Sequence, residues 1–259
     1  KVIQTKSQYD EDSYINHTVE DPNIIPFSMT EPTSSAERIV IRGEPSACPT
    51  FDFGSTLIDV ARDFLEFSYL RINNASTAFS VASSSNWGGT CQGFYAHHIA
   101  GDFSRQIGGI YNVAFFALNG GADVGGAKPI IEYCCIKGDN SSANQNNACF
   151  YASLLNKFVA RNNYFSGVQA GPVYFKHGND YLNKGGSSSV DITFANNYIE
   201  GSVRWAGSYG VINNNIITGR LSVESTGGGQ STDQKYNVIT KNTVIGPINL
   251  SKVDWDRQN

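Results

Sequence analysis

The segments FANNYIEG (residues 194–201) and INNNIITG (212–219) share the pattern that decides the fold of this chain. ARNNYFSG (160–167) and ITKNTVIG (239–246) repeat it. Each segment has Asn at its fourth position, then two mostly β-prone residues, one spacer and Gly. Internal repetition of this kind indicates a solenoid, in which each repeat packs only against its neighbours.

Looser copies of the pattern precede these four segments. Residues 65–71, 94–102 and 131–139 fit a similar frame and extend the Asn column towards the start of the chain. Members of the extended column lie 18 to 37 residues apart: Tyr69, His98, Cys135, Asn163, Asn197, Asn215 and Asn242. The shortest interval corresponds to one bare coil, and the longer intervals correspond to coils that carry loops.

The residue types in the repeat suit stacked β-strands. Asn at a sharp bend tolerates a left-handed backbone and bonds to nearby backbone groups. Stacked strands lie about 4.8 Å apart, so the amide of each Asn can reach the next. The Gly four residues later permits another bend. Regular Leu spacing and helical spacing are both lacking, so we predict a single right-handed parallel β-helix.

The repeat also divides the chain. We predict an irregular N-terminal arm or cap over residues 1–37, the β-helix over 38–250 and a polar tail over 251–259. Residues 57–70 could include a short helix, but they fit equally well as two strands joined by a turn. Loops rich in Gly, Ser and Asn are expected at 120–128, 138–147, 178–189 and 225–235.

Composition restricts the class of protein. Of the 259 residues, 40% are hydrophobic and 16% are charged, so the chain can bury a large core. A net charge of −4 without a basic cluster argues against nucleic acid as a partner. The sequence has no run of 18 apolar residues, which argues against a membrane span. The chain begins at Lys1, and we expect a mature chain or fragment of an extracellular protein.

Five cysteines are present, and their spacing fits no zinc motif. The neighbours Cys134 and Cys135 point to opposite faces of a strand, so one of them is expected inside. We expect the cysteines to act mainly as small buried hydrophobic residues, with at most one disulfide.

A second strand follows each repeat, at residues 173–176, 203–206, 221–224 and 248–251. The first and third positions of these strands are apolar and are predicted to point inward. The second and fourth positions then point outward and form two columns. One column contains Tyr174, Arg204, Ser222 and Asn249, and the other contains Lys176, Ala206, Glu224 and Ser251.

These columns would suit an acidic polysaccharide, because they offer cations, an aromatic ring and hydrogen-bonding groups along one line. Cleavage by β-elimination needs a cation on the sugar carboxylate and a base for the neighbouring proton. Arg204 would bind the carboxylate, and Lys176 would act as the base with a pKa lowered by Arg204. Tyr174 or His177 would protonate the leaving oxygen. The further substrate contacts predicted are Glu224, Trp205, Asn249 and Ser222.

Other interpretations remain open. The outward charges could be an ordinary solvated surface, or a binding groove without catalysis. His98 falls in the bend column, where packing is the expected role, and His97 is a minor candidate. Asp180 is a weak candidate ligand for Ca²⁺, the one cofactor that the sequence suggests. Weaker candidates, in the absence of a D-x-D-x-D-G loop, are Asp102, Glu132 and Asp139.

The repeats resemble the pectate-lyase-like superfamily of right-handed parallel β-helix proteins over most of residues 38–250. The segment GPVYFKHGND (171–180) is similar to the Arg-His-Gly segment of the alginate lyase and chondroitinase B family. In that family the Arg is catalytic, a Lys one coil earlier is the base, and Ca²⁺ often assists.

This chain departs from the family pattern at both positions. Lys176 stands where the Arg would be, and Leu154 falls where the Lys is expected, with Lys157 nearby. The resemblance therefore implies either that the roles have moved to Lys176 and Arg204, or that the chain binds without cutting. The fold also resembles that of phage tailspikes, which would imply a homotrimer that binds surface polysaccharide.

Overall fold

The chain was analysed as a computed structural model, which describes residues 2–5, 38–52, 58–60, 63–74, 77–83, 92–103, 114–120, 128–138, 148–153, 157–167, 172–176, 191–205, 210–223 and 237–250. These residues form 25 strands in three parallel sheets, and no helix occurs among them.

From β2 onward, each sheet takes one strand from every coil. Sheet A contains β1 (Val2–Thr5), β2 (Ile39–Gly43), β5 (Leu65–Ser68), β8 (Tyr95–His97), β11 (Ile130–Glu132), β14 (Lys157–Arg161), β17 (Asp191–Ala195), β20 (Val211–Asn213) and β23 (Val238–Thr240). Sheet B contains β3 (Thr50–Asp52), β6 (Arg71–Asn73), β9 (Ala100–Phe103), β12 (Cys135–Gly138), β15 (Tyr164–Ser166), β18 (Tyr198–Glu200), β21 (Ile216–Ile217) and β24 (Thr243–Val244). Sheet C contains β4 (Ile58–Val60), β7 (Phe79–Ser83), β10 (Ala114–Gly120), β13 (Ala148–Ser153), β16 (Val173–Lys176), β19 (Val203–Trp205), β22 (Leu221–Val223) and β25 (Ile248–Asn249).

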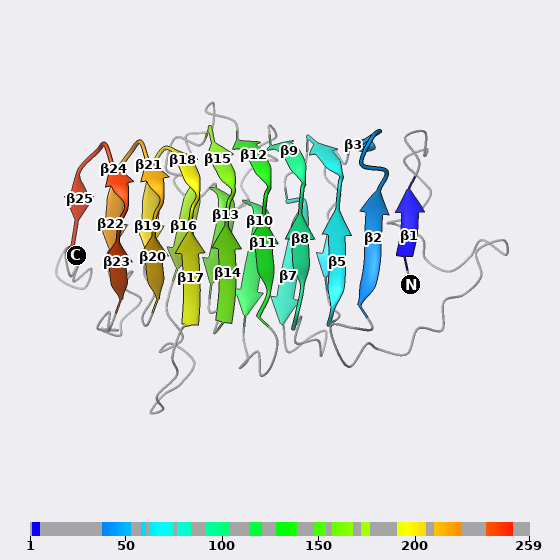
Figure 1. Cartoon of the computed structure of the whole chain (residues 1–259), viewed down its shortest axis with the longest axis horizontal. Helices are drawn as coiled ribbons and strands as arrows, with labels where there is room; N and C mark the ends of the chain where they lie inside the picture. Colours follow the sequence, from blue (N-terminus) through cyan, green and yellow to red (C-terminus); the bar gives the residue numbers. More distant parts are fainter. Residues whose placement is uncertain are drawn as a thin grey trace, which may run out of the picture.

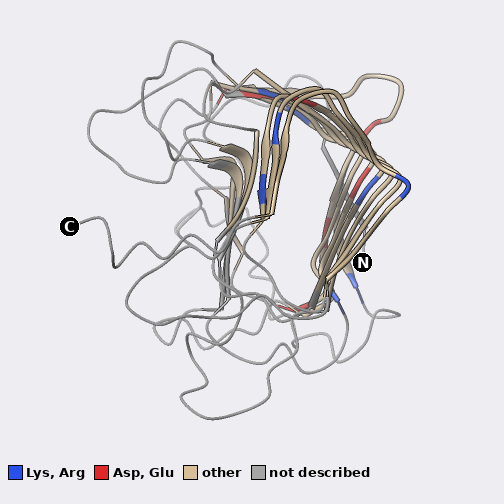
Figure 2. Cartoon of the chain, turned by 90° about the vertical axis from the view of Figure 1, so that its left-hand side faces the viewer, with Lys and Arg blue, Asp and Glu red and all other residues tan. Residues whose placement is uncertain are grey.

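From β2 onward the chain visits sheets A, B and C in turn, so each strand pairs in parallel with the strand three places earlier or later in the chain, and β1 pairs with β2. The coils therefore stack along the long axis of the molecule (Figure 1). Viewed along this axis, the sheets form the walls of one coil (Figure 2). This arrangement confirms the predicted right-handed parallel β-helix.

The strand positions can be compared with three predictions. The β-helix was predicted over residues 38–250, and within that range the first strand, β2, begins at Ile39 and the last strand, β25, ends at Asn249. The N-terminal arm was expected to be irregular, but Val2–Thr5 within it form strand β1, which pairs with β2. Residues 58–60 and 65–68 are strands, with a turn at 63–64, so the two-strand interpretation is confirmed. Most of the four predicted loops lie outside the described residues.

Inward side chains from all three sheets form one continuous core. Phe150 contacts Phe158 and Phe175 from neighbouring strands, with ring centroids 5.1 and 5.3 Å apart. Phe175 continues the stack to Trp205 at 4.5 Å. Burial of each such ring contributes about 2–3 kcal/mol. The core therefore runs along the stack and holds successive coils together.

The bend between sheets A and B uses two adjacent columns rather than the single column predicted. The first column has positive φ and contains Tyr69, His98, Tyr133, Asn162, Asn196, Asn214 and Lys241. The second column holds the ladder amides, and its described hydrogen bonds join Cys134, Asn163, Asn197, Asn215 and Asn242. The predicted column was therefore misaligned by one residue at Tyr69, His98 and Cys135.

The ladder amides bond from coil to coil, as predicted. Nδ2 of Asn163 donates to Oδ1 of Asn197 at 3.0 Å, and Nδ2 of Asn197 donates to Oδ1 of Asn215 at 3.0 Å. Each ladder Asn also accepts the backbone N–H of its neighbour one coil earlier. The predicted left-handed conformation belongs to the preceding residue, and the ladder Asn supplies the side-chain bonds.

The glycine at the end of each repeat has two roles. Gly167 and Gly201 have φ values of +82° and +138°, where a side chain would be strained. Gly219 has no such φ, but a Cβ on it would lie 2.5 Å from the backbone carbon of Gly201. Close approach of coils, as well as bend geometry, therefore requires glycine here.

The two neighbouring cysteines separate as expected. Cys134 is buried and Cys135 is exposed. Burial raises the pKa of the Cys134 thiol to about 12, which keeps it protonated. No disulfide joins any two of the four cysteines in the described ranges, and Cys91 lies outside them.

Candidate functional site

The outer face of sheet C has the predicted column. Tyr174, Arg204, Ser222 and Asn249 lie in register on β16, β19, β22 and β25. The Arg204 guanidinium lies 4.3 Å from the centroid of the Tyr174 ring, a cation–π contact. Tyr151 packs against Tyr174 at 5.6 Å, and both tyrosines are buried. The Arg204 guanidinium therefore lies on a buried aromatic pair on this face.

The other predicted site residues do not join Arg204 in a described site. Trp205 is 0% exposed and faces the core, so the substrate contact expected of it is wrong. Ser222 is also buried, and this leaves little of its side chain for a substrate. Lys176 ends β16, but its side chain is not among those described. Three other predicted residues lie outside the described part of the chain: His177, Asp180 and Glu224.

A denser polar cluster lies on the outer face of sheet A. Ser68, His97, Glu132 and Arg161 lie in register on β5, β8, β11 and β14. A second row beside them includes Glu66 and Tyr95. We call this set, together with His98, Tyr69, Tyr133, Arg38 and Arg42, the sheet A cluster.

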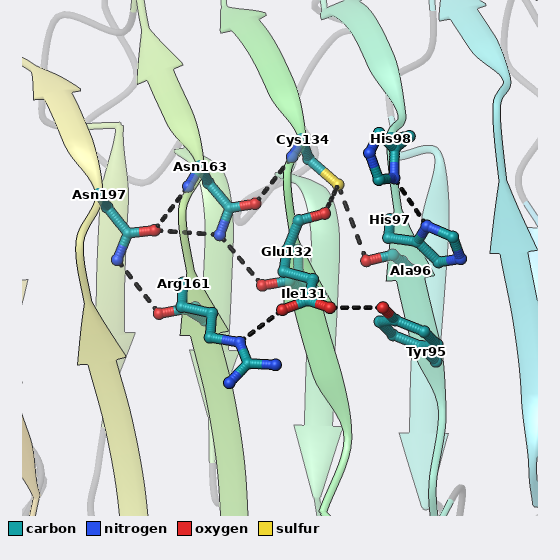
Figure 3. Close-up of polar contacts among 11 residues, drawn as sticks. Tyr95, Ala96, His97, His98, Ile131, Glu132, Cys134, Arg161, Asn163 and Asn197 are labelled. Atoms are coloured by element: carbon teal, nitrogen blue, oxygen red, sulfur yellow. Dashed lines mark hydrogen bonds and ion pairs between the residues drawn. The ribbon is translucent and has the colours of Figure 1, made fainter.

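Glu132 lies at the centre of the sheet A cluster and is buried. The Tyr95 hydroxyl donates to Oε1 and the Arg161 guanidinium donates to Oε2 (Figure 3). Burial alone would raise the pKa of Glu132, but these two hydrogen bonds and the charges of Arg161 and His97 lower it overall. Burial and the bond to Glu132 raise the pKa of Tyr95. Glu132 is therefore a fixed carboxylate that orients its two partners.

A chain of three side chains runs beside Glu132. Oε1 of Glu66 lies 3.1 Å from Nε2 of His97. Nδ1 of His97 lies 2.8 Å from Nδ1 of His98, as Figure 3 shows. Nε of Arg38 lies 3.6 Å from the other carboxylate oxygen of Glu66. Because a carboxylate only accepts hydrogen bonds, Nε2 of His97 carries a proton.

His98 lies in a column of aromatic rings at the bend. It stacks on Tyr69 at 4.8 Å and on Tyr133 at 5.2 Å. All three residues have φ near +55°, a conformation that is costly for bulky side chains. In later coils the same column holds Asn162, Asn196 and Asn214, which adopt this conformation more easily. Backbone strain of this kind clusters at functional sites.

Two arginines form the end of the cluster nearest the N-terminus. Arg38 lies 5.1 Å from the Tyr95 ring, and Arg42 lies 5.1 Å from the Tyr69 ring. Within the described residues, four buried polar side-chain atoms lack a hydrogen-bond partner, and three lie on this face: Arg38 Nη1, Arg42 Nε and Ser68 Oγ. Unsatisfied buried groups call for an explanation such as an unseen water, ion or ligand.

Neither a metal site nor a membrane helix is found in the regions described. These regions contain no group of three or more His, Cys, Asp or Glu residues able to hold a metal ion. They also contain no helix long and apolar enough to cross a membrane.

The sequence prediction missed the sheet A cluster for an identifiable reason. Aligning Cys135 with Asn163 shifted the register by one residue, whereas the structure pairs Cys135 with Tyr164. The correct register places Glu132 directly beside Arg161. A salt bridge between neighbouring coils was the signal that could have revealed this face.

Comparison of the chain with protein-family models, with curated proteins and with solved structures found no match. The site is therefore interpreted from its own geometry.

Proposed function

We propose that this chain is an extracellular protein that binds an acidic polysaccharide along the outer face of sheet A and cleaves it by β-elimination. The observation that carries the proposal is the row of cations, rings and acid–base groups in register across β2, β5, β8, β11 and β14. Four steps of about 4.8 Å separate β2 from β14, so the row extends roughly 19 Å along the stack. A polymer of several sugar units fits this length.

The charges support an anionic ligand. Arg38 and Arg42 lie at one end of the row and Arg161 at the other, and the Arg161 side chain is 47% exposed. Guanidinium groups bind carboxylates through paired hydrogen bonds. A guanidinium on the sugar carboxylate would stabilise the negative charge that develops during elimination.

The proposal is tested by incubating the protein with alginate, pectin and glycosaminoglycans. Binding is measured by calorimetry, and cleavage by the absorbance of the unsaturated product. We expect both with at least one of these polymers. Binding without product would support the alternative of a carbohydrate-binding or adhesion protein. Absence of both binding and product would overturn the proposal.

Two matched variants identify the face that is used. R161A is expected to weaken binding roughly 10- to 150-fold, because a charge-assisted hydrogen bond contributes about 1.5–3 kcal/mol and about 1.4 kcal/mol is a tenfold change. R204A removes the corresponding cation from sheet C and is expected to bind as the wild type does. The opposite result would place the polysaccharide on the sheet C face originally predicted. Thermal unfolding of both variants controls for loss of the fold.

A further inference from the structure

We propose that Nε2 of His98 is the general base of the sheet A cluster, with His97 and Glu66 as the residues that position and orient it. This inference rests on the proposed function, because the proton to be removed belongs to a uronate sugar. It goes further by naming the acid–base group, its tautomer and the residues that enforce it.

The hydrogen bonds determine the tautomer. Glu66 accepts from Nε2 of His97, so a neutral His97 has a bare Nδ1. That Nδ1 accepts from Nδ1 of His98, which leaves Nε2 of a neutral His98 without a proton. Within the described residues, Nε2 of His98 has no hydrogen-bond partner, and the residue is exposed. The chain of bonds therefore presents a basic nitrogen to solvent.

The same chain of bonds distributes the charge that catalysis creates. When Nε2 of His98 takes a proton, its Nδ1 proton can move to Nδ1 of His97. The positive charge then lies on His97, 3.1 Å from the Glu66 carboxylate. Stacking on Tyr69 and Tyr133 holds the His98 ring in place throughout.

The proposed step balances as follows. His98 Nε2 removes the proton from the ring carbon that bears the sugar carboxylate, and the C–H electron pair forms the new carbon–carbon double bond. The bond between the adjacent ring carbon and the glycosidic oxygen breaks, with its electron pair staying on the oxygen. That oxygen takes a proton from water, and the hydroxide formed takes the proton from His98.

The base must be neutral at the working pH. Burial and the neighbouring His97 lower the pKa of His98, whereas Glu132 opposes this shift. Activity should therefore fall only as the pH drops below the ordinary histidine value of 6.5. The charged and titratable groups around His98 on this face are Arg38, Arg42, Glu66, Tyr69, Tyr95, His97, Glu132, Tyr133 and Arg161.

The key variant is His98→Asn, because Asn occupies the same left-handed position in three later coils and should preserve the fold. Loss of a general base lowers kcat about 100-fold or more. We expect this fall in kcat in the variant, with KM changed less than about threefold. The decrease of activity at acidic pH, which reports protonation of the base, should also disappear. Asn214→Gly, in the same column but three coils past the aromatic section, is the control expected to keep wild-type activity.

A second measurement does not depend on activity. Long-range ¹⁵N–¹H spectra of histidine-labelled protein at neutral pH should show His98 protonated at Nδ1 and His97 at Nε2. Glu66→Gln should disturb this pattern and lower kcat. The assignment is overturned if His98 is protonated at Nε2 in the protein without ligand, or if the H98N variant has wild-type kcat. Either result leaves the proposed function standing. Absence of product from the wild-type protein overturns the proposed function, and the role of His98 with it.

Discussion

The side chain of Asn197 makes four hydrogen bonds inside the stack. Its Oδ1 accepts from the backbone and side-chain nitrogens of Asn163, and its Nδ2 donates to Ala160 and to Asn215. Asn197 is buried, so water cannot replace these bonds. The Asn197 side chain thus bonds to groups on the coil before and the coil after its own, and Asn163 and Asn215 repeat this role on those coils.

We expect Asn197→Ala to lower the free energy of unfolding by roughly 3–5 kcal/mol. The reason is that each buried polar group left without a partner costs about 1–3 kcal/mol. Equilibrium unfolding in urea measures the change. The matched control is Asn196→Gly, at an exposed neighbour with φ of 57°, where glycine fits. The control should change stability by less than about 1 kcal/mol, and equal effects of the two variants would contradict a structural role for the ladder.

At the scale of the strands, Glu132 connects three neighbouring strands of sheet A. It lies on β11 and bonds to Tyr95 on β8 and to Arg161 on β14. Its pKa in the folded chain is below the ordinary value of 4.5. The ionised form is therefore favoured by folding, and its stabilisation is complete above pH 4.5. It is lost as the pH falls through the lower folded-state pKa.

The wild-type protein should consequently lose stability steeply below pH 4.5, and Glu132→Gln should flatten this dependence. Chemical unfolding at a series of pH values provides the measurement. At neutral pH the variant should be less stable, because Arg161 loses its charged partner. Glu44→Gln, at an exposed carboxylate, should retain the wild-type slope. An unchanged slope in Glu132→Gln would show that the pH dependence arises elsewhere.

How much the sequence predicts differs between strands. The regular coils with Asn163, Asn197 and Asn215 gave the correct fold, and the apolar alternation gave the correct facing of Val173 and Val203. The earlier coils were misaligned by one residue because Tyr, His and Cys replace Asn there. A shift of one residue turns every side chain to the opposite face of its strand, so the sheet A cluster could not be assembled.

At the scale of the whole molecule, the C-terminal end of the described stack leaves its apolar column uncovered. Large apolar side chains in the last coil are exposed, with Ile248 at 57% and Leu250 at 68%. Ile248 pairs with the fully buried Leu221, so it belongs to the inward column but has no coil beyond it among the described residues. In a solenoid, stability depends on contacts between neighbouring repeats.

Amides in β23, β24 and β25 should therefore exchange with deuterium faster than amides in β14, β15 and β16. The central strands have a paired strand on each side, whereas the last coil is paired on only one side among the described residues. Hydrogen exchange followed by mass spectrometry compares the two groups in one sample. Equal protection would show that the whole stack opens as a single unit.

The spacing of Asn197 and Asn215 has a consequence for how such a chain can grow. The 18 residues from one ladder amide to the next close a complete coil, and both ends of that unit present the same amide. Duplicating the unit in the gene would add one rung of about 4.8 Å and leave the bonding groups matched above and below. Copying a whole coil therefore lengthens the stack without requiring a new kind of interface, whereas adding or removing a single residue within a strand would shift that coil out of register with both of its neighbours.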